Sequence, residues 1–120
     1  MKSNLKTLLE SANALVESYN SAEAKSKVGH EQFIFIDVRE KEELETEGKV
    51  PGALHIPRGM LEFTLDPNSP YYNNIFEVNK TFIFYCKSGG RSVLAAQRAV
   101  EMGLKNVRNL EGGFLGWNKN

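Results

Sequence analysis

Cysteine and histidine are scarce in this chain of 120 residues. Cys86 is the only cysteine, and His30 and His55 are the only histidines. One cysteine excludes an intrachain disulfide, and these three residues cannot supply the four-cysteine or cysteine–histidine sets that hold structural zinc. We therefore expect no disulfide and no bound metal, and any cysteine chemistry must take place at a single position.

Excess charge of either sign is also absent, because 15 lysines and arginines are matched by 15 aspartates and glutamates. Binding to DNA or RNA usually depends on a surplus of positive charge, so we expect no nucleic-acid partner. No segment approaches the ~20 apolar residues of a membrane span, and polar residues interrupt the N-terminus where a secretory signal would be apolar. These absences predict a cytoplasmic protein without a membrane partner.

Two short and almost wholly apolar runs predict the centre of the fold. Residues 33–38 and 81–86 do not alternate apolar with polar side chains, which is typical of strands buried on both faces of a parallel sheet. Shorter predicted strands and helices alternate with these runs, at residues 40–47, 53–56, 57–63, 92–102 and 106–110. This alternation predicts an α/β fold with a mostly parallel sheet.

The segment that suggests chemistry begins where the second apolar run ends, at Cys86. A loop with two glycines follows, and a helix is predicted to begin near Ser92. Glycines allow backbone N–H groups to turn inward as an anion-binding nest, and a helix N-terminus adds partial positive charge. Lys87 and Arg91 add formal charge. All of these favour a thiolate, so we predict that Cys86 is a nucleophile beside an anion-binding loop.

A lone cysteine at a strand end is more often a small buried apolar side chain than a catalytic one. The surroundings of Cys86 favour catalysis, because a purely structural cysteine has no need of an anion-binding loop. Its place at the carboxyl end of a predicted parallel strand is also where open α/β sheets bind their ligands.

Residues 86–92 resemble the active-site loop of the rhodanese-like sulfurtransferases, Cys-x-x-Gly-x-Arg-Ser/Thr, at every position. Three further blocks resemble that family in the same order along the chain. They are the Asp-Val-Arg-Glu block with a later Glu-Leu pair at residues 36–44, the Gly-to-Ile-Pro block at residues 48–57, and the Gly-Gly-x-x-x-Trp block at residues 112–117. Lys49 departs from the pattern, since the family usually has histidine there.

The resemblance implies a three-layer domain, with a mostly parallel central sheet of about five strands and helices on both faces. We assign this domain to residues 21–120. The preceding residues 1–20 carry apolar side chains every three or four positions from Leu5 to Tyr19, which predicts an amphipathic helix with Ser3 or Asn4 as its N-cap. We interpret this segment as an N-terminal helical extension.

The resemblance also implies a thiosulfate:cyanide type of sulfurtransferase that works through a Cys86 persulfide and needs no other cofactor. The donor would be a small anion such as thiosulfate, and the acceptor cyanide, a thiol or a sulfur-carrier protein. Because no second cysteine can resolve the persulfide, the acceptor must come from outside the chain. The residues implied to bind the anion are those of the loop, namely Lys87, Ser88, Gly89, Gly90, Arg91 and Ser92.

Three further charged residues are predicted at the same end of the sheet as Cys86. Asp37 and Arg39 follow the first apolar run, and Arg58 follows the strand predicted at residues 53–56. Asp37 is expected either to pair with Arg91 or Arg58 and brace the loop, or to form a structural ion pair or helix cap. Arg58 is expected either to reach the donor or to pair with Glu62.

Two other functions remain open from the sequence. A phosphatase or arsenate reductase of the related Cys-loop type needs five residues between cysteine and arginine, so that a tetrahedral oxyanion fits inside the loop. Only four residues, 87–90, separate Cys86 from Arg91. A non-catalytic rhodanese-like module that binds a protein or senses redox state is the other alternative, although such modules often lack the cysteine.

Overall fold

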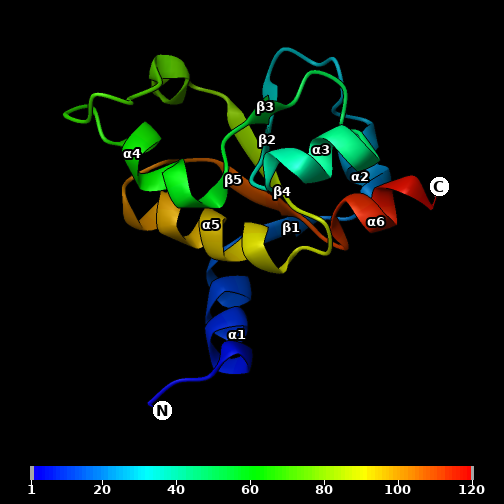
Figure 1. Ribbon diagram of the computed structural model, residues 1–120, viewed down its shortest axis with the longest axis horizontal. Helices are drawn as coiled ribbons and strands as arrows, with labels where there is room; N and C mark the ends of the chain where they lie inside the picture. The colour runs from blue at the N-terminus through cyan, green and yellow to red at the C-terminus, as the bar shows by residue number, and fades with distance from the viewer. Residues whose placement is uncertain (1, 120) are drawn as a thin grey trace.

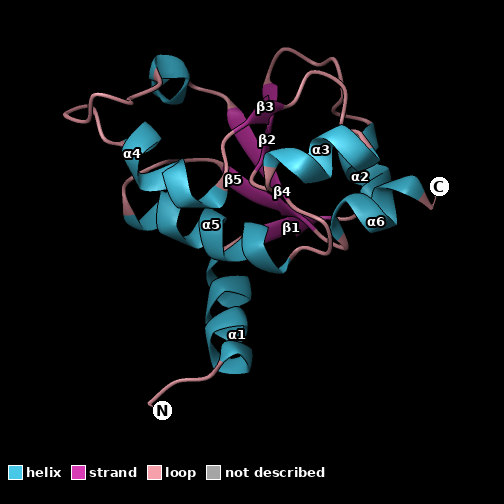
Figure 2. Cartoon of the chain, viewed as in Figure 1, coloured by secondary structure: helices cyan, strands magenta, loops and turns pink. Residues whose placement is uncertain are grey.

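A sheet of five parallel strands lies at the centre of the protein (Figures 1 and 2). The computed structural model describes residues 2–119. The strands are β1 (Glu17–Tyr19), β2 (Phe33–Asp37), β3 (Leu54–His55), β4 (Thr81–Tyr85) and β5 (Val107–Leu110). Their order across the sheet is β1-β5-β4-β2-β3, and every pairing is parallel. The predicted α/β class and five-stranded sheet are therefore confirmed.

Helices cover both faces of the sheet and give the three predicted layers. The α-helices are α1 (Leu5–Leu15), α2 (Ser21–Lys25), α3 (Lys41–Glu47), α4 (Leu61–Leu65), α5 (Gly90–Glu101) and α6 (Gly113–Asn118), and the 3-10 helices are η1 (Arg58–Met60) and η2 (Asn74–Glu77). Side chains of α1, α4 and α5 pack in the core on one face, and those of α2 and α6 on the other. Within residues 2–119, no helix combines the length and apolar character needed to cross a membrane.

Strand β4 shows why the central runs do not alternate in polarity. Phe82 and Phe84 enter the core on the α5 face, whereas Ile83 and Tyr85 enter the core on the α6 face. All four are fully or almost fully buried. Successive side chains of a strand point to opposite faces, so a strand covered on both sides must be apolar throughout. This packing fixes the end of β4, and with it the position of Cys86.

Helix α1 projects away from the sheet toward the N-terminus (Figure 1). Its N-cap is Asn4, one of the two residues predicted for this position, and the Asn4 Oδ1 accepts the N–H of Thr7 at 2.9 Å. Ala12 and Val16 are buried in the same core as α5. The helix predicted as far as Tyr19 ends at Leu15, and strand β1 follows and pairs with β5, with Tyr19 opposite Leu110.

The turn-rich segment between α4 and β4 carries the 3-10 helix η2. Phe76 packs its ring on Phe82 with a centroid separation of 5.4 Å, so it belongs to the core. Tyr71 and Tyr72 instead line a cleft of about 570 Å³ together with residues that include His55 and Met60. This cleft lies between the segment, α4 and β3, and the loop that holds Cys86 does not contribute to its lining.

Candidate active site

Cys86 follows the last residue of β4, and only 1% of its surface is exposed. Its Sγ accepts two backbone hydrogen bonds, from the N–H of Gly89 at 3.2 Å and from the N–H of Ser92 at 3.4 Å. Both donors turn their positive ends toward the sulfur and stabilise negative charge on it. The sulfur thus lies at the carboxyl end of a buried parallel strand, enclosed by the loop that leads into α5.

Gly89 makes this enclosure possible. It has a φ of +101° and occupies the N-cap position of α5. Residues other than glycine rarely adopt this left-handed backbone conformation, which lets the chain turn back over the sulfur. The N–H groups in the first turn of a helix have no partner within the helix. Those of Gly90 and Arg91 are therefore available to a ligand at the same end of α5.

Asn109 of β5 supports the loop from inside the protein, although no motif in the sequence identifies it. Its side chain is buried, its Oδ1 accepts the hydroxyl of Ser92 at 2.6 Å, and its Nδ2 donates to the carbonyl of Gly89 at 3.3 Å. Asn109 therefore holds both residues whose N–H groups bind the sulfur. The only signal in the sequence is a buried polar residue beside Leu110 in a strand that also contains Arg108, and this is too weak to identify Asn109.

The start of α6 supports the other half of the loop. The N–H of Phe114 donates to the carbonyl of Cys86 at 2.8 Å, and the N–H of Leu115 donates to the carbonyl of Lys87 at 3.0 Å. Gly113 lies so close that a Cβ built on it would be 2.5 Å from the carbonyl oxygen of Lys87. Its φ is +58° as well. Gly113 is therefore explained by the close approach of α6 to the Cys86 loop, and Gly112 by its φ of +78° at the N-cap of α6.

Asp37 pairs with Arg39. The alternative prediction, a pair with Arg91 or Arg58, is therefore wrong. The Arg39 Nη2 lies 2.7 Å from the Asp37 Oδ2, and both side chains are fully buried. Residues two apart in an extended chain share a face, so the neighbouring arginine reaches the carboxylate first. Burial lowers the pKa of Arg39, but the hydrogen bonds and charge of Asp37 outweigh it and raise the pKa overall. The structural ion pair is thus the correct interpretation.

Arg39 connects this buried pair to the wall of the site. Its guanidinium lies over the ring of Phe114, 4.6 Å from the centroid, and its Nη2 also donates to the carbonyl of Gly48 at 2.7 Å. The Arg39 carbonyl accepts a hydrogen bond from the His55 Nε2 at 2.7 Å. His55 therefore has a structural partner, and Arg39 packs beneath the residue that holds the Cys86 carbonyl.

Arg91 makes a two-pronged ion pair with Glu43 of α3. Its Nη1 and Nη2 donate to the two carboxylate oxygens at 2.7 and 2.9 Å, with 43% of the Arg91 side chain and 23% of that of Glu43 exposed. The hydrogen bonds of Arg91 are the main cause that lowers the pKa of Glu43 to about 2. The sequence prediction placed the charge of Arg91 beside the anion site but did not foresee this carboxylate partner.

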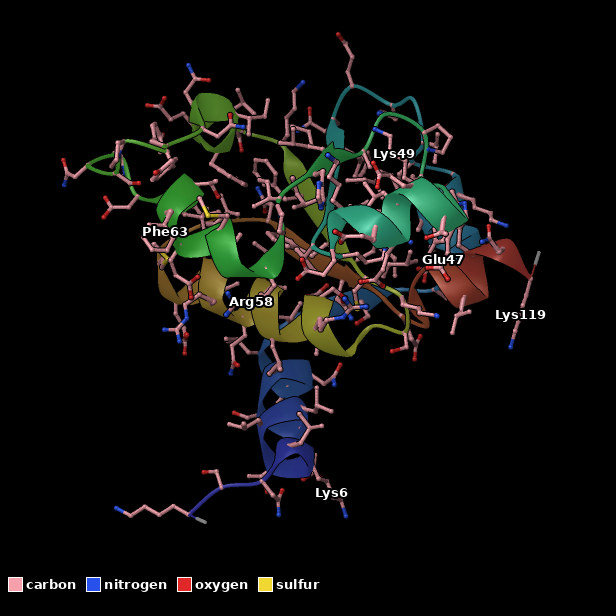
Figure 3. The ribbon with its side chains drawn as sticks, in the orientation of Figure 1. Lys6, Glu47, Lys49, Arg58, Phe63 and Lys119 are labelled. Carbon is pink, nitrogen blue, oxygen red and sulfur yellow. The ribbon has the colours of Figure 1, made fainter. Side chains whose placement is uncertain are left out.

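The two remaining predicted cations also have carboxylate partners. The Lys87 Nζ lies 3.4 Å from the Glu47 Oε2. The Arg58 Nη1 lies 3.0 Å from the Glu62 Oε1, which is the alternative that the sequence left open for Arg58. Figure 3 places Arg58 on the α4 side of the protein and Glu47 at the far end of α3. Among residues 2–119, no cluster of three or more histidine, cysteine, aspartate or glutamate side chains is arranged to hold a metal ion.

Two features define a Cys-loop domain. A cysteine lies at the end of a central strand of a parallel sheet, and N–H groups at the start of the next helix donate hydrogen bonds to its sulfur. Within that class, the family model described as "Rhodanese-like domain" matches residues 20–120. The chain therefore belongs to the rhodanese-like domain family, as the four sequence blocks suggested.

Individual relatives cover most of the chain. Human thiosulfate:glutathione sulfurtransferase is 30% identical over 101 residues, which span 79% of this chain and 87% of the human protein. The structure of the human single-domain sulfurtransferase TSTD1 covers 88% of this chain and 97% of its own, with 27% identity and a TM-score of 0.72. The structure of a Rhodopseudomonas palustris protein of unknown function, described as a possible tyrosine phosphatase, is 43% identical with a TM-score of 0.95. The match covers 99% of this chain and 92% of the Rhodopseudomonas palustris chain.

Proposed function

We propose that this protein is a sulfurtransferase that carries sulfane sulfur on Cys86. One observation supports this above all, namely that the Cys86 Sγ accepts the N–H groups of Gly89 and Ser92 at the carboxyl end of β4. Membership of the rhodanese-like family and similarity to named sulfurtransferases support the same conclusion.

In the first step, the Cys86 thiolate attacks the outer sulfur of a donor such as thiosulfate. A new S–S bond forms to Cys86, the S–S bond of thiosulfate breaks, and its electron pair leaves with sulfite. The product is a Cys86 persulfide, which is a covalent intermediate of double-displacement catalysis. The N–H groups of Gly90 and Arg91 would stabilise the negative outer sulfur, because they lie in the first turn of α5.

In the second step, a thiolate or cyanide attacks the outer sulfur, and the electron pair of the breaking S–S bond returns to the Cys86 thiolate. A low-molecular-weight thiol such as glutathione is the acceptor that we propose, following the name of the human relative. A sulfur-carrier protein would use the same chemistry. We also propose a cytoplasmic location, since a free thiol persists in a reducing compartment.

Intact-mass spectrometry tests the proposal directly. Treatment with thiosulfate should add one sulfur atom to the protein, and addition of cyanide or glutathione should remove it. Cys86→Ser should show no such adduct and no transfer of sulfur to cyanide, while its urea unfolding midpoint confirms that it is folded. Transfer by Cys86→Ser at the wild-type rate would contradict the mechanism. Absence of any adduct on the wild-type protein would instead favour a non-catalytic module.

The description of the Rhodopseudomonas palustris relative makes phosphatase activity the competing function. The loop has four residues between Cys86 and Arg91, and Arg91 is already engaged by both oxygens of Glu43. Both features disfavour a phosphate group inside the loop. We expect no hydrolysis of p-nitrophenyl phosphate under conditions that support sulfur transfer, and hydrolysis that depends on Cys86 would reverse this assignment.

A further inference from the structure

Two carboxylates of α3 face the two cationic side chains of the Cys86 loop. Glu43 and Glu47 are four residues apart, so they lie on the same side of α3. Glu43 holds Arg91 through hydrogen bonds of 2.7 and 2.9 Å, and Glu47 lies 3.4 Å from Lys87. Each formal positive charge of the loop is therefore matched by a negative charge from one helix.

The other arginines near this end of the sheet do not restore the balance. Arg58 pairs with Glu62, and the buried Arg39 pairs with Asp37. Glu47 also lies 3.6 Å from the Arg39 Nη1, so this one carboxylate faces both Arg39 and Lys87. The attraction that remains for an anion comes mainly from backbone N–H groups, which carry only partial charge.

We propose that Glu43 and Glu47 set the donor preference of the Cys86 site, because they lower its affinity for dianions such as thiosulfate more than its affinity for sulfane-sulfur donors with one negative charge. This inference rests on the proposed sulfurtransferase function. Both carboxylates act through Lys87 and Arg91, so they are specificity-determining positioning residues and not catalytic ones.

The physical reason is that Coulomb energy scales with the charge of the ligand. Two carboxylates beside the loop repel a dianion twice as strongly as a monoanion at the same place. Methanethiosulfonate is a suitable comparison, because it replaces one charged oxygen of thiosulfate with a methyl group and keeps the transferable sulfur. Attack by the Cys86 thiolate on that sulfur forms the same persulfide and releases methanesulfinate, so atoms and electrons balance.

Charge removal on α3 provides the test. Glu43→Gln, Glu47→Gln and the double variant each release a loop cation while keeping the size of the side chain. Glu42→Gln and Glu45→Gln are matched controls, because both residues are exposed on the same helix, and no ion pair to either is found among residues 2–119. Glu43→Asp, which keeps the charge, serves as the rescue variant.

Binding is measured in a Cys86→Ser background by calorimetry with thiosulfate and with methanethiosulfonate, so that no sulfur transfer is required. We expect Glu43→Gln and Glu47→Gln to tighten thiosulfate binding about three- to tenfold and methanethiosulfonate binding about half as much on a logarithmic scale. The ratio of kcat/KM values for the two donors should shift in the same direction in enzymes that keep Cys86. The controls and Glu43→Asp should leave both ratios near their wild-type values.

Weaker thiosulfate binding in Glu43→Gln would overturn the inference, because it would mean that Glu43 serves to hold Arg91 in a binding position. Equal shifts in the Glu42→Gln control would also overturn it, since the effect would then follow the overall charge of α3. If the binding ratio shifts as expected but no Cys86 persulfide forms, the proposed function fails while the charge effect stands. The two conclusions are therefore separable.

Discussion

The Cys86 loop is held on two sides by different kinds of interaction. On its inner side, Asn109 and the N–H of Phe114 at the start of α6 bind the loop through hydrogen bonds between buried residues, and Arg39 packs beneath Phe114. On its outer side, the carboxylates of α3 hold Arg91 and Lys87 through ion pairs that remain in contact with solvent. The same seven-residue loop thus has buried contacts on one side and solvent-exposed ion pairs on the other.

The difference separates what shapes the site from what tunes its charge. Buried polar contacts are expensive to break, because the group left behind loses its partner without gaining water. Exposed ion pairs contribute little to folding, since water and salt already screen them. We therefore expect substitutions on the inner side to change stability and loop geometry. Substitutions on the outer side should change the preference of the site for ligands of different charge.

The largest effect is expected at the bottom of the inner side, from Asp37→Asn. This change keeps the shape of the side chain but removes the buried counter-ion of Arg39, which is left with only the partly exposed Glu47 carboxylate at 3.6 Å. Loss of one partner of a buried ion pair typically destabilises a protein by about 3–5 kcal/mol. Urea unfolding measures the loss. Glu62→Gln, which weakens the partly exposed ion pairs of Glu62 with Arg58 and Arg98, should change the unfolding free energy by about 1 kcal/mol or less. Equal losses of unfolding free energy in the two variants would contradict the distinction between the inner and outer sides of the loop.

A smaller effect is expected from Gly113→Ala. The added Cβ would lie 2.5 Å from the Lys87 carbonyl at a φ of +58°, so α6 must move away from the loop. We expect a loss of about 1–3 kcal/mol in unfolding free energy, together with slower formation of the Cys86 persulfide. Gly116→Ala is the control, because no atom lies within 4 Å of its added Cβ, and it should keep wild-type kinetics.

The smallest effect on stability is expected on the outer side, from Glu43→Gln. The pKa of Glu43 is lowered to about 2 from its ordinary 4.5, chiefly by the hydrogen bonds of Arg91. A lowered pKa means that the pair stabilises the fold above pH 4.5, and that this contribution disappears as the pH falls toward 2. Solvent screening limits it to about 0.2–1 kcal/mol.

Unfolding of the wild type and of Glu43→Gln, compared between pH 7 and pH 3, checks this expectation. The difference between the two proteins should be constant at neutral pH, shrink below pH 4.5 and decrease in 1 M salt. A difference that grows on acidification would contradict the ion pair as its source.

The central features of the fold and the loop could be predicted from the sequence, because they depend on local patterns. The apolar runs that became β2 and β4 and the glycines after Cys86 determine their own conformations. The partner of Arg91 could not be predicted, because Glu43 and a thiolate at Cys86 compete for the same guanidinium and the outcome depends on where α3 lies. The partner of Asp37 was also left open by the sequence, and in the structure it is Arg39, two residues further along the chain.

Two other features were missed because they act only in the assembled structure. Strand β1 has just three residues and no apolar run, so it becomes a strand only where β5 offers it an edge. Asn109 is a residue type that usually indicates turns, and its role depends on Gly89 and Ser92, which lie 20 and 17 positions away in the chain.

Strand β1 also has a consequence for handling the protein. The family match begins at residue 20, yet β1 ends at Tyr19 and pairs along β5, with Ser18 opposite Asn109. A fragment cut at the family boundary would present the backbone of β5 as a bare edge, open to pairing with another copy. With β1 in place, the edge strand on that side of the sheet has only three residues, and a short edge strand leaves little backbone for another copy to pair with.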